Sequence, residues 1–273
     1  METQIRDKVY WHDAFFEALQ LELHEYLDAL TFANEHPLSK EALIVDVLVI
    51  KKERDIKIEK NIGKIFKAIN LFEFKSETDS LTVRDYNKVM GYAYLYASFA
   101  PAHASDITIS FAVTVHPRDL LDYLENDCKF KISYSDDGIC YVSGETFVVQ
   151  ILESKKLSPE KNLFLKNLRS NLDIEEARRT MDAYKELKEF ERRNAYVDRI
   201  VKANPNVFEE VFEMSDAALR NMVIVALAEE KGLLKEHDMK NARKIARDLK
   251  EENVPIQVIV KSTKLSLQEV EAL

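Results

Sequence analysis

The stretch LFEFKS, residues 71–76, alternates aromatic with charged side chains. If this stretch forms a strand, its two phenylalanines point to one face and Glu73 and Lys75 to the other, because successive side chains of a strand alternate. An acid and a base on one face could work together on a substrate. An ion pair exposed to water, worth at most about 1 kcal/mol, is the simpler alternative.

Asp46 favours the catalytic interpretation, because it interrupts the β-branched, apolar run EALIVDVLVI of residues 41–50. A buried strand normally carries no acid. Neighbouring strands lie about 4.8 Å apart, so pairing of this strand with residues 71–76 would let Asp46 and Glu73 contact one cation. Carboxylate oxygens without His or Cys favour Mg²⁺ or Mn²⁺ as that cation.

These residue types suit the cleavage of a phosphodiester. A cation bound by Asp46 and Glu73 would polarise a phosphoryl oxygen and lower the pKa of a bound water. Lys75 would orient that water or stabilise the charge that builds in the transition state. Paired carboxylates without a lysine would instead suit glycoside hydrolysis. The pattern therefore predicts a metal-dependent nuclease.

A third unusual acid, Glu22, belongs to a predicted amphipathic helix over residues 10–30. The helix has an apolar stripe, and Glu22 falls in its middle. The stripe consists of Trp11, Phe15, Ala18, Leu19, Tyr26 and Leu30. A buried carboxylate there requires a partner. The alternative is that the stripe opens at this point and Glu22 reaches solvent.

The remaining patterns predict the elements that would position these residues. Residues 31–40 are irregular, with room for a short strand bearing Glu35 before a turn at Pro37. Thr82 is expected to N-cap a helix over 81–100, with Asp85 at its third position. The other predicted elements are a partly helical basic segment over 51–70, strands over 107–115 and 145–152, a short helix in HPRDLLDYLEN, and a hairpin turning at Asp137-Gly138.

Composition limits the class of protein. The chain has 273 residues, 46% of them apolar, and only 5 Gly and 6 Pro, which favours a helix-rich fold over a β-sandwich. Its formal charge of −9 excludes DNA binding by bulk charge. Cys128 and Cys140 have the spacing of neither a zinc site nor a disulfide framework. No signal core or membrane-spanning run is present, so we expect a soluble, cytoplasmic protein without a membrane partner.

The character of the sequence changes near Ser158-Pro159, so we expect a first domain over residues 1–157 and a helical C-terminal region over 158–273. Helices are predicted over 160–200 and 205–234. The last forty residues suggest three short helices, the second beginning at Pro255 and the third N-capped by Ser266. Their spacing is that of a helix-turn-helix, although three-helix packing without DNA contact is equally common.

Three segments carry a resemblance to a known family. LSKEALIVDVLVIKK, NIGKIFKAINLFEFKS and LTVRDYNKVMGYAYLYAS together resemble bacterial PD-(D/E)XK nuclease family transposases, which are related to the recombination-promoting nucleases. The resemblance covers residues 10–115. It implies an α/β fold, namely a restriction-endonuclease-like mixed sheet flanked by helices, here with an all-α C-terminal extension.

The resemblance also implies roles for individual residues. Asp46 and Glu73 would be metal ligands and Lys75 the catalytic lysine. Glu22 would be the helix acid that completes the catalytic and metal-binding set, with Glu35 as a competitor for that role. The sequence departs from the family pattern at Val45, where the family has Pro, and in its long connection between the two strands.

The implied activity is that of a Mg²⁺-dependent DNA endonuclease, a hydrolase linked to transposition or recombination. Lys88 and Tyr92, on the helix after the motif, would lie near the phosphate of the DNA. A homodimer would suit double-strand cutting, although no heptad or apolar patch identifies an interface. The competing hypothesis is an inactive nuclease-like scaffold that binds DNA or protein, since fold does not fix function.

Overall fold

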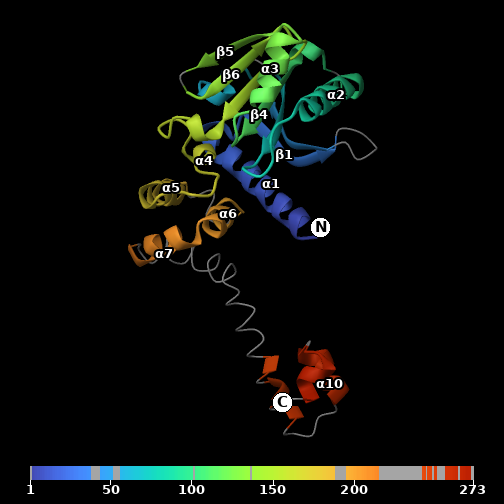
Figure 1. The fold of residues 1–273 in the computed structure, drawn as a ribbon, viewed down its shortest axis with the longest axis vertical. Coiled ribbons are helices and arrows are strands. Elements are labelled where there is room, and N and C mark those ends of the chain that lie inside the picture. The colour runs from blue at the N-terminus through green and yellow to red at the C-terminus, as the bar shows by residue number, and fades with distance from the viewer. Residues whose placement is uncertain are drawn as a thin grey trace. The chain divides into compact units, whose positions relative to one another are not determined.

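The computed structural model divides the chain into two compact units, residues Met1–Val211 and Phe212–Leu273, which are described separately (Figure 1). The structure describes residues 2–37, 44–51, 56–100, 102–135, 137–187 and 195–214, and in the C-terminal part 242–243, 245–247, 249–250, 256–263 and 265–271. The helix predicted over residues 215–234 and the helix start predicted at Pro255 concern residues outside this part.

A seven-stranded mixed sheet forms the centre of the first unit, in the order β1-β2-β3-β4-β7-β6-β5. The neighbours β3, β4 and β7 run parallel, and the remaining pairs are antiparallel. The strands are β1 (Leu30–Pro37), β2 (Ile44–Lys51), β3 (Ile69–Lys75), β4 (Ile107–Val113), β5 (Lys131–Ser135), β6 (Ile139–Ser143) and β7 (Val148–Glu153). The expected strands and the hairpin are thereby confirmed.

Helices cover both faces of the sheet, and the alternation of β3 decides what each face meets. Phe74 stacks on Phe15 of α1 (Glu2–Glu22), with ring centroids 4.7 Å apart. Leu71, on the opposite face, belongs to the apolar cluster formed with α2 (Val83–Phe99) and α3 (Arg118–Asn126). Because side chains of a strand alternate, α1 covers one face, and α2 and α3 cover the other.

The first helix ends earlier than its apolar stripe suggests. α1 stops at Glu22, a 3₁₀ turn follows at His24–Tyr26, and β1 begins at Leu30. The predicted helix over 10–30 is therefore wrong in its last residues. Residues 23–29 form turns, and only Leu30 of the predicted helix belongs to β1, which pairs with β2 along its length.

The start of α2 confirms the expected cap. Thr82 accepts a hydrogen bond from the backbone N–H of Asp85, and the Asp85 side chain accepts one from the backbone N–H of Thr82.

Gly138 has a φ of 73° in the tight turn between β5 and β6. That left-handed conformation favours glycine.

The basic segment before β3 is less helical than expected, since residues 56–68 contain only a 3₁₀ turn, Asn61–Gly63.

Four helices of the C-terminal half complete the first unit. They are α4 (Leu163–Lys166), α5 (Ile174–Glu186), α6 (Ala195–Ala203) and α7 (Pro205–Met214). Tyr196 donates its backbone N–H, and Tyr184 its hydroxyl, to the buried Glu17 of α1. α5 and α6 therefore pack on α1 and belong to the sheet-bearing unit. The boundary of this unit falls inside α7 and not after residue 157.

The second unit contains α10 (Ile256–Thr263) and α11 (Leu267–Glu271). Its apolar cluster is formed by Ala246, Ile259, Leu265 and Val270. Ser266 caps α11 as expected: its hydroxyl accepts the backbone N–H of Glu269, whose side chain accepts the backbone N–H of Ser266. The helix-turn-helix character of this unit stays a prediction.

Two absences follow from the described residues. No helix among them is both long and apolar enough to cross a bilayer. Cys128 and Cys140 are thiols and form no disulfide. The architecture itself is α/β, a mixed sheet flanked by helices.

Candidate active site

The two strands that carry the predicted acids pair with each other. β2 and β3 are antiparallel, with Val47 opposite Phe72. The next position in this register places Asp46 opposite Glu73. The Asp46 carboxylate also fixes the end of the ladder, because its Oδ2 accepts a 2.8 Å hydrogen bond from the backbone N–H of Phe74. The pairing that the proposed chemistry requires is therefore present.

Glu73 is a buried acid with a strongly raised pKa. It is only 4% exposed, and burial together with the negative charge of Asp46 raises its pKa to about 7, against the opposing charges of Lys88, Lys75 and His12. Its Oε1 lies 3.8 Å from Lys75 Nζ and 3.6 Å from Lys88 Nζ. Its Oε2 is buried without a hydrogen-bond partner. A buried carboxylate oxygen with no partner can accept a further ligand.

Lys75 is held as an ammonium ion. Burial would lower its pKa, but the hydrogen bond to Asp85 and the charges of Glu73 and Asp79 outweigh burial and raise the pKa. Its Nζ lies 3.1 Å from Asp85 Oδ1 and 3.3 Å from Asp79 Oδ2. A charged ammonium is a poor general base and a good stabiliser of developing negative charge. Lys75 thus suits the second of these tasks.

His12 belongs to the site but was not among the predicted residues. Its Nδ1 lies 3.7 Å from Asp46 Oδ1, and its charge acts on Glu73. The sequence offered a weak signal, because His12 directly follows Trp11 of the apolar stripe. A single histidine on a helix has too many other uses for that position to identify it.

Glu22 is not brought to the acid pair. Its Oε1 accepts the backbone N–H groups of Phe164 and Leu165, at 2.6 and 3.0 Å, and its Oε2 lies 2.9 Å from Lys60 Nζ. In α1 it follows His12 by ten residues, so it lies about 15 Å further along the helix axis. Burial raises its pKa, against the charge of Lys60 and the backbone hydrogen bonds. The expected role of Glu22 in the site is corrected to that of an N-terminal cap for α4.

The competitor, Glu35, lies in β1 between Asn34 and His36, whose backbones pair with Val47 and Val45 of β2. Its backbone is therefore close to the Asp46 segment of β2. The side chain of Glu35 lies outside the described part of the structure, and its role as the completing acid stays a prediction.

Of the two residues expected near the phosphate, Lys88 lies beside Glu73, and Tyr92 lies beside Lys88. Lys88 Nζ reaches Glu73, as given above, and also lies 5.4 Å from the ring centroid of Tyr92. The Lys88 side chain is 42% exposed, so it borders the site on the solvent side. An exposed cation next to a buried acid pair is suited to contact an anionic substrate.

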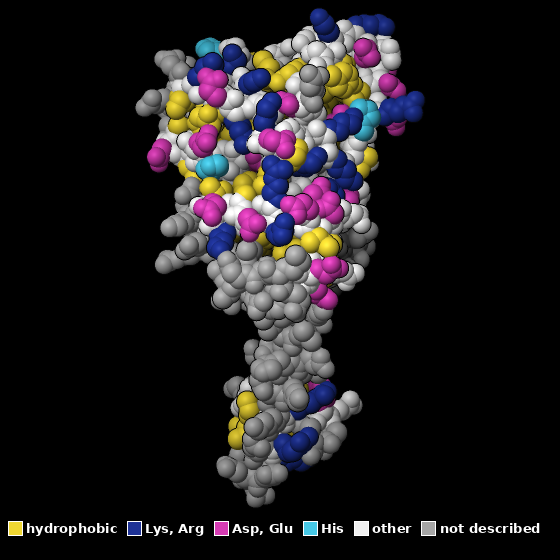
Figure 2. Space-filling view, turned by 90° about the vertical axis from the view of Figure 1, so that its left-hand side faces the viewer, with side chains coloured by type: hydrophobic (Ala, Val, Ile, Leu, Met, Phe, Trp, Pro, Cys, Tyr) yellow, Lys and Arg dark blue, Asp and Glu magenta, His cyan; other side chains and the backbone are white. Residues whose placement is uncertain are grey.

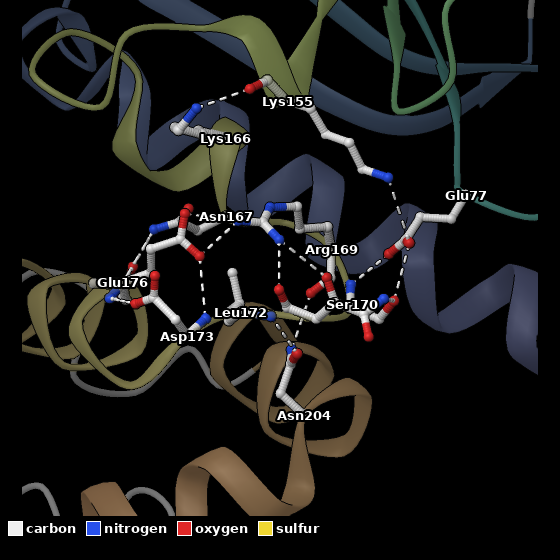
Figure 3. Close-up of polar contacts among 12 residues, drawn as sticks. Glu77, Lys155, Lys166, Asn167, Arg169, Ser170, Leu172, Asp173, Glu176 and Asn204 are labelled. Atoms are coloured by element: carbon white, nitrogen blue, oxygen red, sulfur yellow. Dashed lines mark hydrogen bonds and ion pairs between the residues drawn. The ribbon is translucent and has the colours of Figure 1, made fainter.

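The loop after Lys75 is tied to the helical part of the unit (Figure 3). Glu77 accepts hydrogen bonds from the backbone N–H and the hydroxyl of Ser170, the latter at 2.9 Å. Lys155 Nζ lies 3.7 Å from the same carboxylate. Arg169, next to Ser170, pairs with Glu176 at 2.6 Å. These contacts restrain the loop that connects Lys75 to α2.

The donor set fits Mg²⁺ only in part. No cluster of three or more His, Cys, Asp or Glu able to hold a metal occurs among the described residues. Asp46 and Glu73 offer two carboxylates as metal ligands. Oε2 of Glu73 has no hydrogen-bond partner within the protein. Mg²⁺ characteristically uses one or two carboxylates and completes its shell with water and substrate phosphate. Within that preference, the two residues suffice as protein ligands.

The surface does not present an extended basic face on the side that Figure 2 shows. There, Lys and Arg side chains are intermixed with Asp and Glu among the described residues. This agrees with the formal charge of −9.

Comparison of the chain with protein-family models, curated proteins and solved structures found no match.

Proposed function

We propose that this chain is a metal-dependent endonuclease that hydrolyses phosphodiester bonds of DNA, as the resemblance to the PD-(D/E)XK transposases implies. The fold would then be the restriction-endonuclease-like variant of the mixed α/β architecture. The observation that carries the proposal is the meeting of Asp46, Glu73 and Lys75 at the paired ends of β2 and β3, with Glu73 Oε2 buried and without a partner.

Each residue has a task in this proposal. Asp46 and Glu73 would hold Mg²⁺ or Mn²⁺, which supplies Lewis-acid activation of a phosphoryl oxygen and of water. Lys75, kept protonated by Asp85 and Asp79, would stabilise the negative charge of the transition state. Lys88 would contact a flanking phosphate.

The partner would be DNA, attracted locally and not by the whole chain. The buried Lys75, the exposed Lys88 and a bound divalent ion would offset the acidic character of the protein around the scissile phosphate. This makes binding dependent on both the metal and the salt concentration. A homodimer, which would allow cutting of both strands, stays part of the proposal.

A plasmid-nicking assay in Mg²⁺ tests the proposal. We expect cleavage by the wild-type chain and losses of at least about 100-fold in Asp46→Asn, Glu73→Gln and Lys75→Gln, the scale on which single electrostatic groups act in catalysis. Asp122→Asn is the matched control, because Asp122 is 63% exposed and pairs only at 3.9 Å with Arg118. Equal cutting by all variants purified in parallel, or none by the wild type, would refute the assignment.

One observation favours the alternative, a nuclease-like scaffold that binds DNA or protein without cutting. Lys75 and Lys88 already lie within 4 Å of Glu73, so the acid is partly compensated by the protein alone. On this hypothesis, Mg²⁺ would neither stabilise the chain nor change its DNA binding. Metal binding thus separates the two functions independently of any cleavage assay.

A further inference from the structure

The helix α2 contains a glycine that the packing of the described residues does not require. Gly91 is exposed, lies in the middle of α2 and has a helical backbone conformation without a positive φ. A Cβ built on it would meet no described atom within 4 Å. Glycine is less favourable than any residue except proline inside a helix. The described fold therefore gives no reason for a glycine at a position where it weakens α2.

The side of α2 that bears this glycine is exposed and polar. With 3.6 residues per turn, positions 84, 87, 88, 91 and 98 share one side of the helix. All five residues are exposed, and none of them is an acid. We call this side the Gly91 face, and it is formed by Arg84, Asn87, Lys88, Gly91 and Ser98. Leu95, which is half-buried, adds one apolar side chain to it.

The acids that contact α2 are directed to other groups. Asp85 is the one acid of this helix, and it accepts the 3.1 Å hydrogen bond from Lys75. Glu145 accepts a 3.3 Å hydrogen bond from the hydroxyl of Tyr86, which is only 2% exposed. Arg84 forms no ion pair with a described residue. Its charge is therefore available to an anion.

The Gly91 face borders the candidate active site through Lys88. Lys88 Nζ lies 3.6 Å from Glu73 Oε1, and the side chain remains 42% exposed. Gly91 follows Lys88 by three residues, so it lies about 4.5 Å further along the helix axis. Arg84 precedes Lys88 by four residues, about 6 Å in the opposite direction. A linear polyanion that reaches the acid pair can therefore extend along this face.

We propose that the sugar–phosphate backbone of the DNA substrate lies on the Gly91 face of α2. This inference rests on the proposed function, because it names a contact surface for the same substrate. Gly91 lets the DNA backbone approach the helix closely, while Arg84 and Lys88 neutralise phosphates. Asn87 donates a hydrogen bond to a phosphate oxygen, as amide side chains do in protein–DNA contacts.

The composition of the Gly91 face favours DNA over a second copy of the chain. The buried core of a protein–protein interface is depleted of charged residues, whereas this face carries two cations and only Leu95 as an apolar side chain. Charge complementarity to a polyanion therefore decides between the two occupants.

Substitution of Gly91 tests the proposal, because it should change stability and binding in opposite directions. We expect Gly91→Ala and Gly91→Leu to raise the Tm by about 2 °C, since both residues are better helix formers than glycine. Gly91→Leu should nevertheless weaken binding of a labelled DNA duplex about tenfold, equivalent to 1.4 kcal/mol, and Gly91→Ala should weaken it less. Fluorescence anisotropy with the full chain in EDTA measures the affinity without cleavage. A loss of binding in a more stable protein cannot result from unfolding.

The salt dependence of DNA binding tests the contribution of the cations. Arg84→Gln should weaken binding at low salt and lower the slope of log K against log salt concentration by about 1, as expected for one phosphate contact. Lys131→Gln is the matched control, because it removes an exposed lysine from β5 at the edge of the sheet. It should leave both the affinity and the slope unchanged.

The proposal is overturned if Gly91→Leu binds DNA as tightly as the wild type, or if Arg84→Gln behaves as Lys131→Gln. A changed oligomeric state of Gly91→Leu in sedimentation, with unchanged DNA affinity, would overturn it in favour of a protein interface. Failure of the endonuclease function is distinguishable. Binding that depends on Gly91 and Arg84 without nicking by the wild type would support this surface and refute the nuclease, whereas absence of DNA binding by the wild type would overturn both.

Discussion

The carboxylate of Asp85 both binds Lys75 and takes part in the N-terminal cap of α2. Its Oδ1 accepts the 3.1 Å hydrogen bond from Lys75 Nζ, while its Oδ2 accepts the backbone N–H of Thr82 at 3.1 Å and the Thr82 hydroxyl at 2.6 Å. The cap of the helix and the orientation of the ammonium are therefore coupled. Desolvation alone would raise the pKa of Asp85, but the hydrogen bonds from Thr82 and Lys75 lower it, so the carboxylate stays ionised.

Replacing Asp85 with asparagine should impair cleavage more than it impairs folding. The amide keeps an acceptor for the cap but removes the charge that holds Lys75, so we expect a fall of about tenfold or more in the Mg²⁺-dependent nicking rate. Nicking rates of the variant and the wild type, measured side by side at the same pH, check this effect.

Thr82→Ala is the matched control for this variant. It removes the hydroxyl that caps α2, at a cost of about 1 kcal/mol in the free energy of unfolding, and leaves the contact between Asp85 and Lys75 in place. If Thr82→Ala and Asp85→Asn lose activity in proportion to their loss of stability, Asp85 has no role beyond the helix cap.

Divalent cations should stabilise the first unit through Asp46 and Glu73. A ligand that binds only the folded state at 100 times its Kd adds about 2.7 kcal/mol to the free energy of unfolding. We therefore expect a rise in Tm with increasing Mg²⁺ or Mn²⁺ that disappears in Asp46→Asn and in Glu73→Gln. Scanning calorimetry with Ca²⁺-free buffers and EDTA blanks measures this, and Asp122→Asn should respond as the wild type does.

Because Glu73 has a raised pKa in the folded chain, the free energy of unfolding should fall as the pH rises. Its pKa is about 7 in the folded chain against an ordinary value of 4.5. The contribution of Glu73 is fully present below pH 4.5 and is lost as the pH rises to about 7, because the unfolded chain releases the proton first. The loss amounts to about 3 kcal/mol at most, since one pKa unit corresponds to 1.36 kcal/mol.

Urea unfolding of the wild type and of Glu73→Gln at several pH values isolates this contribution. The fluorescence of the single tryptophan, the buried Trp11, reports on the first unit. The difference in free energy of unfolding between the two proteins should change across pH 4.5–7 in favour of Glu73→Gln, and saturating Mg²⁺ should reduce that change. A difference that does not vary with pH would show that Glu73 ionises at its ordinary pKa.

Local patterns were sufficient to predict the strands that carry the acid pair. The alternation in LFEFKS identified β3, and the interrupted apolar run identified β2, because side-chain periodicity is a property of the strand itself. The opposition of Asp46 and Glu73 depends on the register between the two strands. Residues far apart in sequence set that register, so it was a condition of the hypothesis and needed the structure to establish it.

The role of Glu22 illustrates what the sequence could not provide. The pattern showed a carboxylate in an apolar stripe, which requires a partner, but it did not identify the partner. The partners are the backbone of α4, more than 140 residues later in the chain, and Lys60. His12 was not predicted, because its position next to Trp11 is too weak a signal to identify a site residue, and only the packing of α1 on the sheet brings it to Asp46.

Glu22→Gln should therefore destabilise the fold and leave metal binding intact. The glutamine retains an oxygen for one or both backbone N–H groups of α4 but loses the charge that pairs with Lys60, so we expect a loss of about 2 kcal/mol in the free energy of unfolding. Lys60→Met and the double variant complete a double-mutant cycle, in which the pair should show a coupling energy of about 1 kcal/mol or more. The Kd for Mg²⁺, measured well below the Tm of each variant, should match that of the wild type. A Glu22→Gln chain that folds with unchanged stability and no longer binds Mg²⁺ would restore Glu22 to the metal-binding set.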